Sequence, residues 1–305
     1  MTYQDKWSQG CLMEHGEREC AKRYELIRSF CAEYRRPFTV LDIGAASAYF
    51  CRRLTESFPD CTAVGIESDM PTEDIPAFFR GTTRIVWLRH HFTLHELRAV
   101  AECEHFDVVL GLSVIHHFGG SFEDRLQVFR SLGDNLILEL AVEDEACGGD
   151  QKDYELPADH CLLGYGDSHL VEGTKRPIVL MSQMKTSISK AYIGSPRTDL
   201  SLSIYSDFLL KQVTFFNKKE ERAWLRGLNL WTYQSFGGVW PTRAMIADQL
   251  EAQREGILAG GHGDINAWNI ILQGDNVVFV DVHGPMDVKF DDVQYFDRLV
   301  GELQS

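Results

Sequence analysis

The hydrophobic pattern of residues 36–150 is a series of short apolar runs with helix-like segments between them. Runs rich in β-forming residues lie at Phe38–Ile43, Thr62–Ile66, Phe106–Leu112 and Leu136–Val142. Helix-compatible segments lie at Ala48–Ser57 and Phe122–Leu132. Short buried strands that alternate with helices are typical of a parallel sheet with helices on both faces. The pattern therefore predicts an α/β domain built on a doubly wound sheet.

Residues 1–35 are more polar and follow a helical period. Tyr24, Ile27 and Cys31 recur at spacings of three and four, which places them on one face of a helix. We therefore expect residues 1–35 to form a helical lead-in or lid beside the first domain.

The composition of the chain changes at Glu143, where a short acidic stretch rich in turn-forming residues reads EDEACGGDQKD. Such a stretch predicts a domain boundary, here near residue 150, so that residues 151–305 form a second, smaller α+β domain. Its expected strands are Cys161–Gly164, Ile178–Ser182, Phe208–Phe215 and Asn276–Val280, and its expected helices are Lys218–Leu228 and about Thr242–Leu258. The first two strands are expected to form a hairpin that opens this domain.

Bulk composition narrows the class of protein. The net charge of −15 disfavours a nucleic-acid partner, because sequence-independent nucleic-acid binding relies on Lys and Arg. The apolar runs are far shorter than the about 20 residues that a membrane span needs, and no basic segment followed by an apolar one marks the N-terminus. We therefore expect no transmembrane helix, no secretory signal and a cytoplasmic protein.

The chain has eight cysteines, none of them in a C-x-x-C or other metal-ligand spacing. In a cytoplasmic protein such cysteines are expected to be reduced thiols rather than disulfides. The cysteines therefore predict no metal site.

Small residues follow the first strand, where residues 40–48 read VLDIGAASA. A small-residue turn at the carboxyl end of a parallel strand lets the backbone approach a ligand, and the amide groups of the next helix face it. The GxGxxG pattern of dinucleotide enzymes is absent, which disfavours a pyrophosphate and favours a smaller nucleoside. Glu67 directly follows the next strand, where its carboxylate can accept hydrogen bonds from both ribose hydroxyls of an adenosine.

This combination resembles the class I S-adenosylmethionine-dependent methyltransferases, whose first motif is VLDIG followed by small residues and whose second strand ends in an acid. The resemblance continues through residues 106–118 and 136–140. It implies a Rossmann-like fold and S-adenosylmethionine as methyl donor. The donor-binding residues that it implies are Asp42, Gly44, Ala45, Glu67 and Leu112. The sequence departs from the family at Ala46 and Ala48, where many members have Gly, and these residues tighten the sterics of the turn.

Several of the candidate residues have more than one possible role. Two interpretations of Asp42 stay open: it fixes the loop by accepting backbone N–H groups, or it contacts the sulfonium directly. For Glu67, ribose binding is favoured over a solvated strand end. Of His116 and His117, one is expected to pack structurally and the other to face the cleft as a general base. An alcohol acceptor needs such a base to remove its proton, whereas a phosphate acceptor is already anionic.

A second motif stands near the C-terminus, where residues 262–272 read HGDINAWNIIL and residues 278–281 read VFVD. It resembles the catalytic and metal-binding segments of the protein-kinase and aminoglycoside-phosphotransferase superfamily. The resemblance implies that Asp264 accepts the proton of a substrate hydroxyl and that Asn269 and Asp281 hold Mg²⁺ against the phosphates of ATP. It also implies that Lys211, on an expected strand, binds phosphate with Glu221 as its ion partner.

Two features depart from the kinase pattern. The stretch between Glu221 and Asp264 is too short for the remaining strands, hinge and helix of a kinase. Asp281 is followed by Val282-His283-Gly284 instead of Phe-Gly. We therefore expect a shortened kinase-like domain, and the sequence leaves its binding of ATP open.

Together the two halves resemble the bacterial O-antigen chain-terminating enzymes, in which a methyltransferase is fused to a kinase that caps a polymannose chain. Residues 111–117 and 138–142 and the hairpin region 163–177 carry this resemblance. It implies that Tyr3, Gln4 and Arg23 of the lead-in reach the methyl donor. It also implies a glycan, sugar or sugar-phosphate acceptor, and a glycosyltransferase partner or a homo-oligomer.

Three hypotheses of function follow. The leading one is an S-adenosylmethionine-dependent methyltransferase that acts on a glycan, sugar or sugar-phosphate, with the kinase-like domain presenting the acceptor. The second is a bifunctional enzyme that phosphorylates a terminal sugar and then methylates it. In the third, the C-terminal domain is a non-catalytic module that binds a partner. A small-molecule acceptor also stays open, because the donor motifs identify no acceptor.

Overall fold

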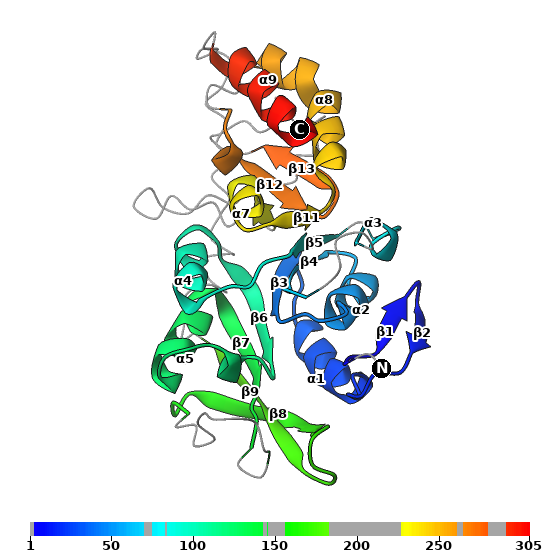
Figure 1. Cartoon of the computed structure of the whole chain (residues 1–305), viewed down its shortest axis with the longest axis vertical. Coiled ribbons are helices and arrows are strands. Elements are labelled where there is room, and N and C mark those ends of the chain that lie inside the picture. The colour runs from blue at the N-terminus through cyan, green and yellow to red at the C-terminus, as the bar shows by residue number, and fades with distance from the viewer. Residues whose placement is uncertain are drawn as a thin grey trace.

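The computed structural model describes residues 3–69, 75–82, 84–142, 145, 156–182, 227–260, 265–279 and 291–305. Two parts are visible in Figure 1: a large sheet with its helices, and a smaller C-terminal group of helices and short strands. Among the helices of the described ranges, none is both long and apolar enough to cross a membrane.

Eight strands form the main sheet, in the order β11-β5-β4-β3-β6-β7-β9-β8. Their bounds are β3 (Phe38–Ile43), β4 (Cys61–Ile66), β5 (Ile85–Leu88), β6 (Phe106–Leu112), β7 (Gly133–Glu139), β8 (His160–Asp167), β9 (Lys175–Ser182) and β11 (Gly238–Trp240). Strands β3 to β7 pair in parallel, and β9 is antiparallel to both of its neighbours. The four predicted runs of the first domain correspond to β3, β4, β6 and β7.

Helices cover both faces of this sheet (Figure 1). On one face pack α1 (Ala21–Cys31) and α2 (Tyr49–Ser57), and on the other α4 (Leu94–Cys103) and α5 (Phe122–Ser131). Successive residues of β3 alternate between the two cores, because Val40 packs with α1 and α2 whereas Leu41 packs with α4 and α5. The fold is therefore an α/β fold with a mixed, doubly wound sheet of the Rossmann-like type.

The lead-in consists of a β-hairpin and one helix. β1 (Lys6–Ser8) pairs antiparallel with β2 (Cys11–Glu14), and α1 follows. Tyr24, Ile27 and Cys31 of α1 are fully buried, as their spacing predicts. The sequence does not predict the hairpin, because β2 is exposed along its whole length and has no buried face to set an alternation.

The position of β8 and β9 differs from the sequence expectation, which made them the start of a second domain. Both strands complete the main sheet, since β9 pairs with β7 and β8 pairs with β9. Ile178, Val179 and Met181 of β9 are buried, and the strand covers an edge of β7 that would otherwise present unpaired backbone groups. A change in composition along the chain does not reveal which sheet a later strand joins.

The C-terminal part has a three-stranded antiparallel sheet of β10 (Leu228–Asn229), β12 (Ile270–Gln273) and β13 (Asn276–Phe279). Its helices are α7 (Leu230–Ser235), α8 (Arg243–Gly260) and α9 (Asp291–Gln304). The expected helix at 242–258 and strand at 276–280 correspond to α8 and β13. The expected strand at 208–215 lies outside the described residues, as does the helix at 218–228 apart from its last two positions.

The two parts share one core and one sheet. β11, which follows α7, pairs antiparallel with β5 at the edge of the main sheet. A single apolar cluster also runs from Val86 and Leu97 to Leu230 and Ile246 of the C-terminal part. The C-terminal part is therefore packed firmly against the β5 edge of the main sheet.

Candidate active site

The loop between β3 and α2 has an unusual backbone. Gly44, Ala46 and Ala48 have φ values of +72°, +47° and +57°, in the left-handed region that favours glycine. A Cβ on Gly44 would meet Val114 Cγ2 at 2.8 Å, so this position accepts only glycine without movement of a neighbour. Ala46 and Ala48 adopt the same kind of conformation with a side chain, which costs about 1–2 kcal/mol per residue.

Glu67 closes this loop from the neighbouring strand. Its Oε2 accepts a hydrogen bond from the backbone N–H of Ala46 at 2.8 Å, and its Oε1 accepts from the backbone N–H of Ser68 at 2.7 Å. The carboxylate that follows β4 therefore lies directly beside the turn that follows β3. Both features stand at the carboxyl ends of adjacent parallel strands, where ligands of open α/β sheets bind.

A cavity of about 660 Å³ opens beside this loop, a size suited to a small ligand. Among the residues predicted from sequence, six line it: Tyr3, Gly44, Glu67, Leu112, His116 and His117. Four others are not in its lining: Gln4, Arg23, Asp42 and Ala45. Ala45 and Gln4 are both buried, and Gln4 Oε1 accepts a 3.5 Å hydrogen bond from Ser47 Oγ of the loop.

Asp42 is buried at the end of β3. The thiol of Cys51 donates to its Oδ2 at 3.8 Å, and burial raises the pKa of the carboxyl to about 7. Among the described residues, no backbone N–H of the loop donates to Asp42; those of Gly44 and Ala45 donate to the carbonyl of Ile66 and that of Ala46 to Glu67. The side chain therefore lies beneath the loop, next to α2.

His116 and His117 form the short helix η2 (Ile115–His117), and their ring centroids are 4.2 Å apart. Both rings line the cavity, whereas the sequence expectation placed one of them in the packing. His116 Nδ1 is buried and has no hydrogen-bond partner in the described part of the chain. Burial, reinforced by the neighbouring His117 and Arg176, lowers the pKa of His116 to about 4. At neutral pH the His116 ring is therefore uncharged.

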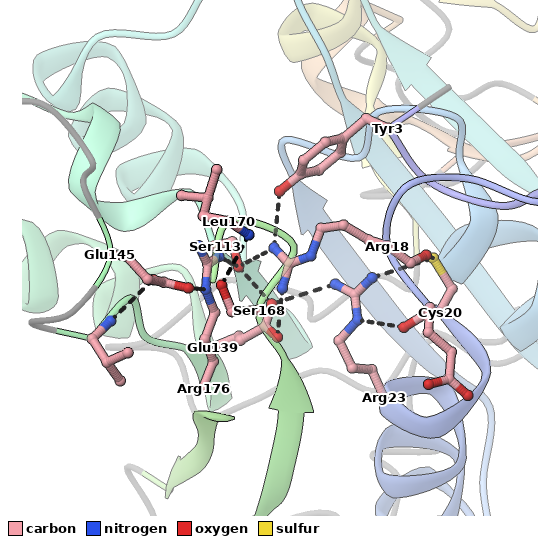
Figure 2. Close-up of polar contacts among 12 residues, drawn as sticks. Tyr3, Arg18, Cys20, Arg23, Ser113, Glu139, Glu145, Ser168, Leu170 and Arg176 are labelled. Atoms are coloured by element: carbon pink, nitrogen blue, oxygen red, sulfur yellow. Dashed lines mark hydrogen bonds and ion pairs between the residues drawn. The ribbon is translucent and has the colours of Figure 1, made fainter. Parts of the chain in front are cut away.

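A buried network of charges forms another wall of the site (Figure 2). Glu139, at the end of β7, accepts hydrogen bonds from Arg18 Nη2 at 2.8 Å, Arg23 Nη1 at 3.3 Å and Ser113 Oγ at 2.5 Å. These four side chains come from the lead-in and from the ends of two strands. The carboxylate thereby fixes the lead-in against the sheet.

Ser113 joins a third guanidinium group, that of Arg176, to this network (Figure 2). Its Oγ accepts from Arg18 Nη1 at 2.6 Å and from Arg176 Nη1 at 2.8 Å. Arg18 also donates to the hydroxyl of Tyr3 at 2.9 Å, and Arg176 Nε donates to Glu145 Oε1 at 2.5 Å. Tyr3, Ser113 and Arg176 line the cavity. The network's three guanidinium groups face two carboxylates, so the network carries a surplus of positive charge, and Arg176 is its one guanidinium group in the cavity lining.

This network is hardly predictable from the sequence. Arg18, Glu139 and Arg176 stand far apart in the chain, and no local spacing relates them. Glu139 alone offers a signal, because a carboxylate within the apolar run at 136–142 must find a partner if that run is buried. His169, from the turn between β8 and β9, also lines the cavity and is absent from the sequence-based set.

The predicted kinase-like residues are mostly outside the described ranges. Lys211, Glu221, Asp264 and Asp281 all fall there. Asn269 is described and is buried at the end of η4 (Ala267–Asn269). The described residues contain no group of three or more His, Cys, Asp or Glu side chains that could hold a metal ion.

Comparisons with known proteins point to methyltransferases. No protein-family model matches the chain. The O-antigen chain terminator bifunctional methyltransferase/kinase WbdD of Escherichia coli is 30% identical over 191 residues, covering 56% of this chain and 26% of the relative. A second WbdD sequence of Escherichia coli matches to the same extent. This chain therefore spans about a quarter of the length of the curated relatives it matches.

Solved structures of lower similarity include WbdD with the kinase inhibitor LY294002, at 22% identity and a TM-score of 0.44, covering 94% of this chain and 81% of that chain. The N-terminal domain of EvdMO1 with S-adenosylhomocysteine and D-fucose aligns at 14% identity and a TM-score of 0.42, over 59% of this chain and 91% of that one. The sequence similarity to WbdD confirms the predicted resemblance to S-adenosylmethionine-dependent methyltransferases, in particular to the bifunctional chain terminators.

Proposed function

We propose that this chain is an S-adenosylmethionine-dependent methyltransferase whose donor binds at the ends of β3 and β4. The observation that carries the proposal is the contact between Glu67 and the backbone of Ala46 at one mouth of the cavity. It brings the carboxylate that we assign to ribose binding and a tight small-residue turn to the same place. A nucleoside with a short charged tail fits that pair of features.

The chemistry of the lining supports such a donor. Glu67 would hold the ribose hydroxyls, Gly44 would let the backbone approach the ligand, and Leu112 with Ile66 and Phe92 would pack against its apolar surface. When bound, S-adenosylmethionine supplies an electrophilic methyl group. The residues of the chain then have to position an acceptor atom in line with it and exclude water from the cavity.

We further propose a glycan or sugar-phosphate as the acceptor, with the phosphate as the methylated group. WbdD is, by name, an O-antigen chain terminator, which supports a saccharide. Arg176 lines the cavity and Arg18 lies behind it in the same network, which favours an anion because Arg recognises phosphate well. His116, whose pKa burial lowers to about 4, is too weak a base to deprotonate an alcohol at neutral pH. An acceptor that is already ionised does not need such a base.

A second candidate function concerns the C-terminal part. The HGDxxxxN segment and the buried Asn269 within it support a kinase that phosphorylates a terminal sugar before methyl transfer. This reading requires ATP and Mg²⁺, held by Asn269 and Asp281, and it predicts that Asp281→Ala abolishes their binding. The alternative, a non-catalytic module that binds a glycosyltransferase or a second copy of the chain, predicts no nucleotide binding at all.

The test of the proposed function is methyl transfer from labelled S-adenosylmethionine to matched oligosaccharides with and without a terminal phosphate. We expect label only in the phosphorylated series, as a methyl phosphodiester. Label in the unphosphorylated series would contradict the phosphate acceptor, and no donor binding would contradict the function itself. The exposed-surface variant Glu33→Gln, remote from the cavity lining, serves as the control protein.

A further inference from the structure

Two tryptophans of the C-terminal part stack in parallel at the surface. The ring centroids of Trp231 in α7 and Trp268 in η4 are 4.0 Å apart, with an interplanar angle of 16°. Trp268 is 46% exposed although Trp231 covers one of its faces. Its exposed area therefore belongs to the opposite face and the ring edge, as far as the described residues show.

A single side chain fixes both tryptophans. Asn229 Oδ1 accepts a hydrogen bond from the backbone N–H of Trp231 at 2.8 Å, and Asn229 Nδ2 donates to the carbonyl of Trp268 at 2.6 Å. Glu104, which directly follows helix α4, accepts in turn from the backbone N–H of Asn229 at 3.1 Å. It also accepts from the hydroxyl of Thr232. The stack is thus held before any ligand arrives, which lowers the entropy lost on binding.

A run of aromatic rings connects the stack with the cavity. Trp231 contacts Phe236 with centroids 6.3 Å apart, and Phe236 contacts Phe92 at 5.1 Å. Phe92 lines the cavity, while Trp231 and Phe236 are partly exposed. A partly exposed aromatic strip therefore leads from the surface of the C-terminal part to the wall of the candidate active site.

The two segments that carry the tryptophans are polar and almost uncharged. Helix α7 contains no charged residue, and Ile265–Phe279 contains Asp275 as its one charged residue. A polyanion would need cations at this place. Asn229 and Thr232 are buried and bonded within the protein, whereas Asn266, whose Oδ1 accepts from the backbone N–H of Trp268 at 2.9 Å, is partly exposed beside the rings. Neutral polar groups beside a flat aromatic face suit a molecule with both an apolar face and many hydroxyls.

We propose that the Trp231–Trp268 stack is a saccharide-binding subsite that holds neutral sugar units of the acceptor while its reacting end lies in the cavity. The C–H face of a pyranose packs on the open face of Trp268, beside the partly exposed polar side chain of Asn266. The proposal rests on the proposed glycan acceptor for what occupies the cavity. Binding at the stack itself is measurable without any methyl transfer.

The experiment is a calorimetric titration of the full chain with mannotetraose and, separately, maltotetraose. We expect at least one tetrasaccharide to bind, Trp268→Ala to weaken it about tenfold or more, and Trp268→Phe to weaken it less because a smaller flat face remains. Tyr295→Ala is the matched control, since Tyr295 on α9 is an equally exposed aromatic, at 45%. This variant should bind as the unmodified chain does.

Two outcomes would overturn the subsite: equal affinity in the unmodified chain and Trp268→Ala, or no binding of either tetrasaccharide to the unmodified chain. A parallel titration with S-adenosylhomocysteine shows that each variant is folded. If that ligand fails to bind the unmodified chain while a tetrasaccharide binds through Trp268, the methyltransferase function is contradicted and the subsite stands. The two proposals can therefore fail separately.

Discussion

Arg18 and Glu139 lie 121 positions apart in the chain, yet Arg18 Nη2 donates to Glu139 Oε1 at 2.8 Å and the side chains are 1% and 0% exposed. Buried charges are stable only when geometry and further hydrogen bonds compensate for the loss of water. Arg23 and Ser113 supply those further bonds to Glu139. The pair thereby fixes the lead-in at the carboxyl end of β7, beside the cavity.

Removing the charge of Glu139 should therefore destabilise the fold strongly. We expect Glu139→Gln to lower the free energy of unfolding by about 3 kcal/mol or more, because two buried guanidinium groups lose their counter-charge. Urea unfolding measures this loss. Glu25→Gln, which breaks the exposed Arg28–Glu25 pair, should unfold like the unmodified chain. Equal small losses in both variants would show that the network contributes no more than a surface pair.

Two substitutions in the loop after β3 should change the free energy of unfolding in opposite directions. Gly44→Ala should lower the free energy of unfolding by about 2 kcal/mol, because it combines a left-handed φ with contact against Val114. Ala46→Gly should raise it by up to about 1 kcal/mol by relieving the same backbone conformation. Thermal and urea unfolding of both variants measure these changes.

The variant Gly81→Ala separates the two causes of the stability loss in Gly44→Ala, which are the left-handed φ and the contact with Val114. Gly81 has a φ of +81° and no atom within 4 Å of an added Cβ, so this variant reports the backbone cost alone. We expect it to lose less stability than Gly44→Ala and to keep donor binding. Equal losses of stability in Gly44→Ala and Gly81→Ala would show that the contact with Val114 does not contribute to the loss.

The lowered pKa of His116 predicts a pH dependence of stability. The ring stays neutral in the fold down to about pH 4, whereas in the unfolded chain it takes up a proton below its ordinary pKa of about 6.5. Protons then favour the unfolded state, so stability is lost as pH falls from about 6.5 to 4. Relative to His116→Asn, the unmodified chain should lose about 2 kcal/mol between pH 7 and pH 5.

Urea unfolding at the two pH values measures that difference. His95→Asn, at an exposed position on α4, is the control and should parallel the unmodified chain at both pH values. A His116→Asn variant with the same pH dependence as the unmodified chain would contradict a buried neutral ring at this position.

Glu67 is expected to set the affinity for the methyl donor. Glu67→Gln keeps an acceptor oxygen for the loop but loses the charge that strengthens hydrogen bonds to ribose hydroxyls, so affinity for S-adenosylmethionine should fall about 10- to 100-fold. Equilibrium dialysis measures the change, with Glu33→Gln as the exposed control. Unchanged affinity in Glu67→Gln would place the ribose elsewhere.

The apolar runs of the sequence predict the centre of the sheet well. Strands β3, β4 and β6 are buried on every residue, so each appears as a short continuous apolar run. Ile85–Leu88 escapes the same inspection because four residues are too few to stand out. The place of β8 and β9 also escapes it, because strand pairing depends on contacts between segments distant in the chain.

The sequence also predicts some residues of the candidate site and not others. Gly44 and Glu67 stand at strand ends within a local pattern, so the sequence indicates them and the cavity includes them. Arg18, Ser113 and Arg176 act through one another across three segments, and no local spacing encodes such a network. The polar identity of Glu139 within an apolar run is the one local sign of it.

The central claim is that the cavity beside Gly44 and Glu67 binds S-adenosylmethionine. Its most direct test is a calorimetric titration of the unmodified chain with S-adenosylhomocysteine, the product of methyl transfer. We expect saturable binding of one molecule per chain, weakened in Glu67→Gln. The absence of any binding, or binding that is unaffected by both Glu67→Gln and Gly44→Ala, would contradict it.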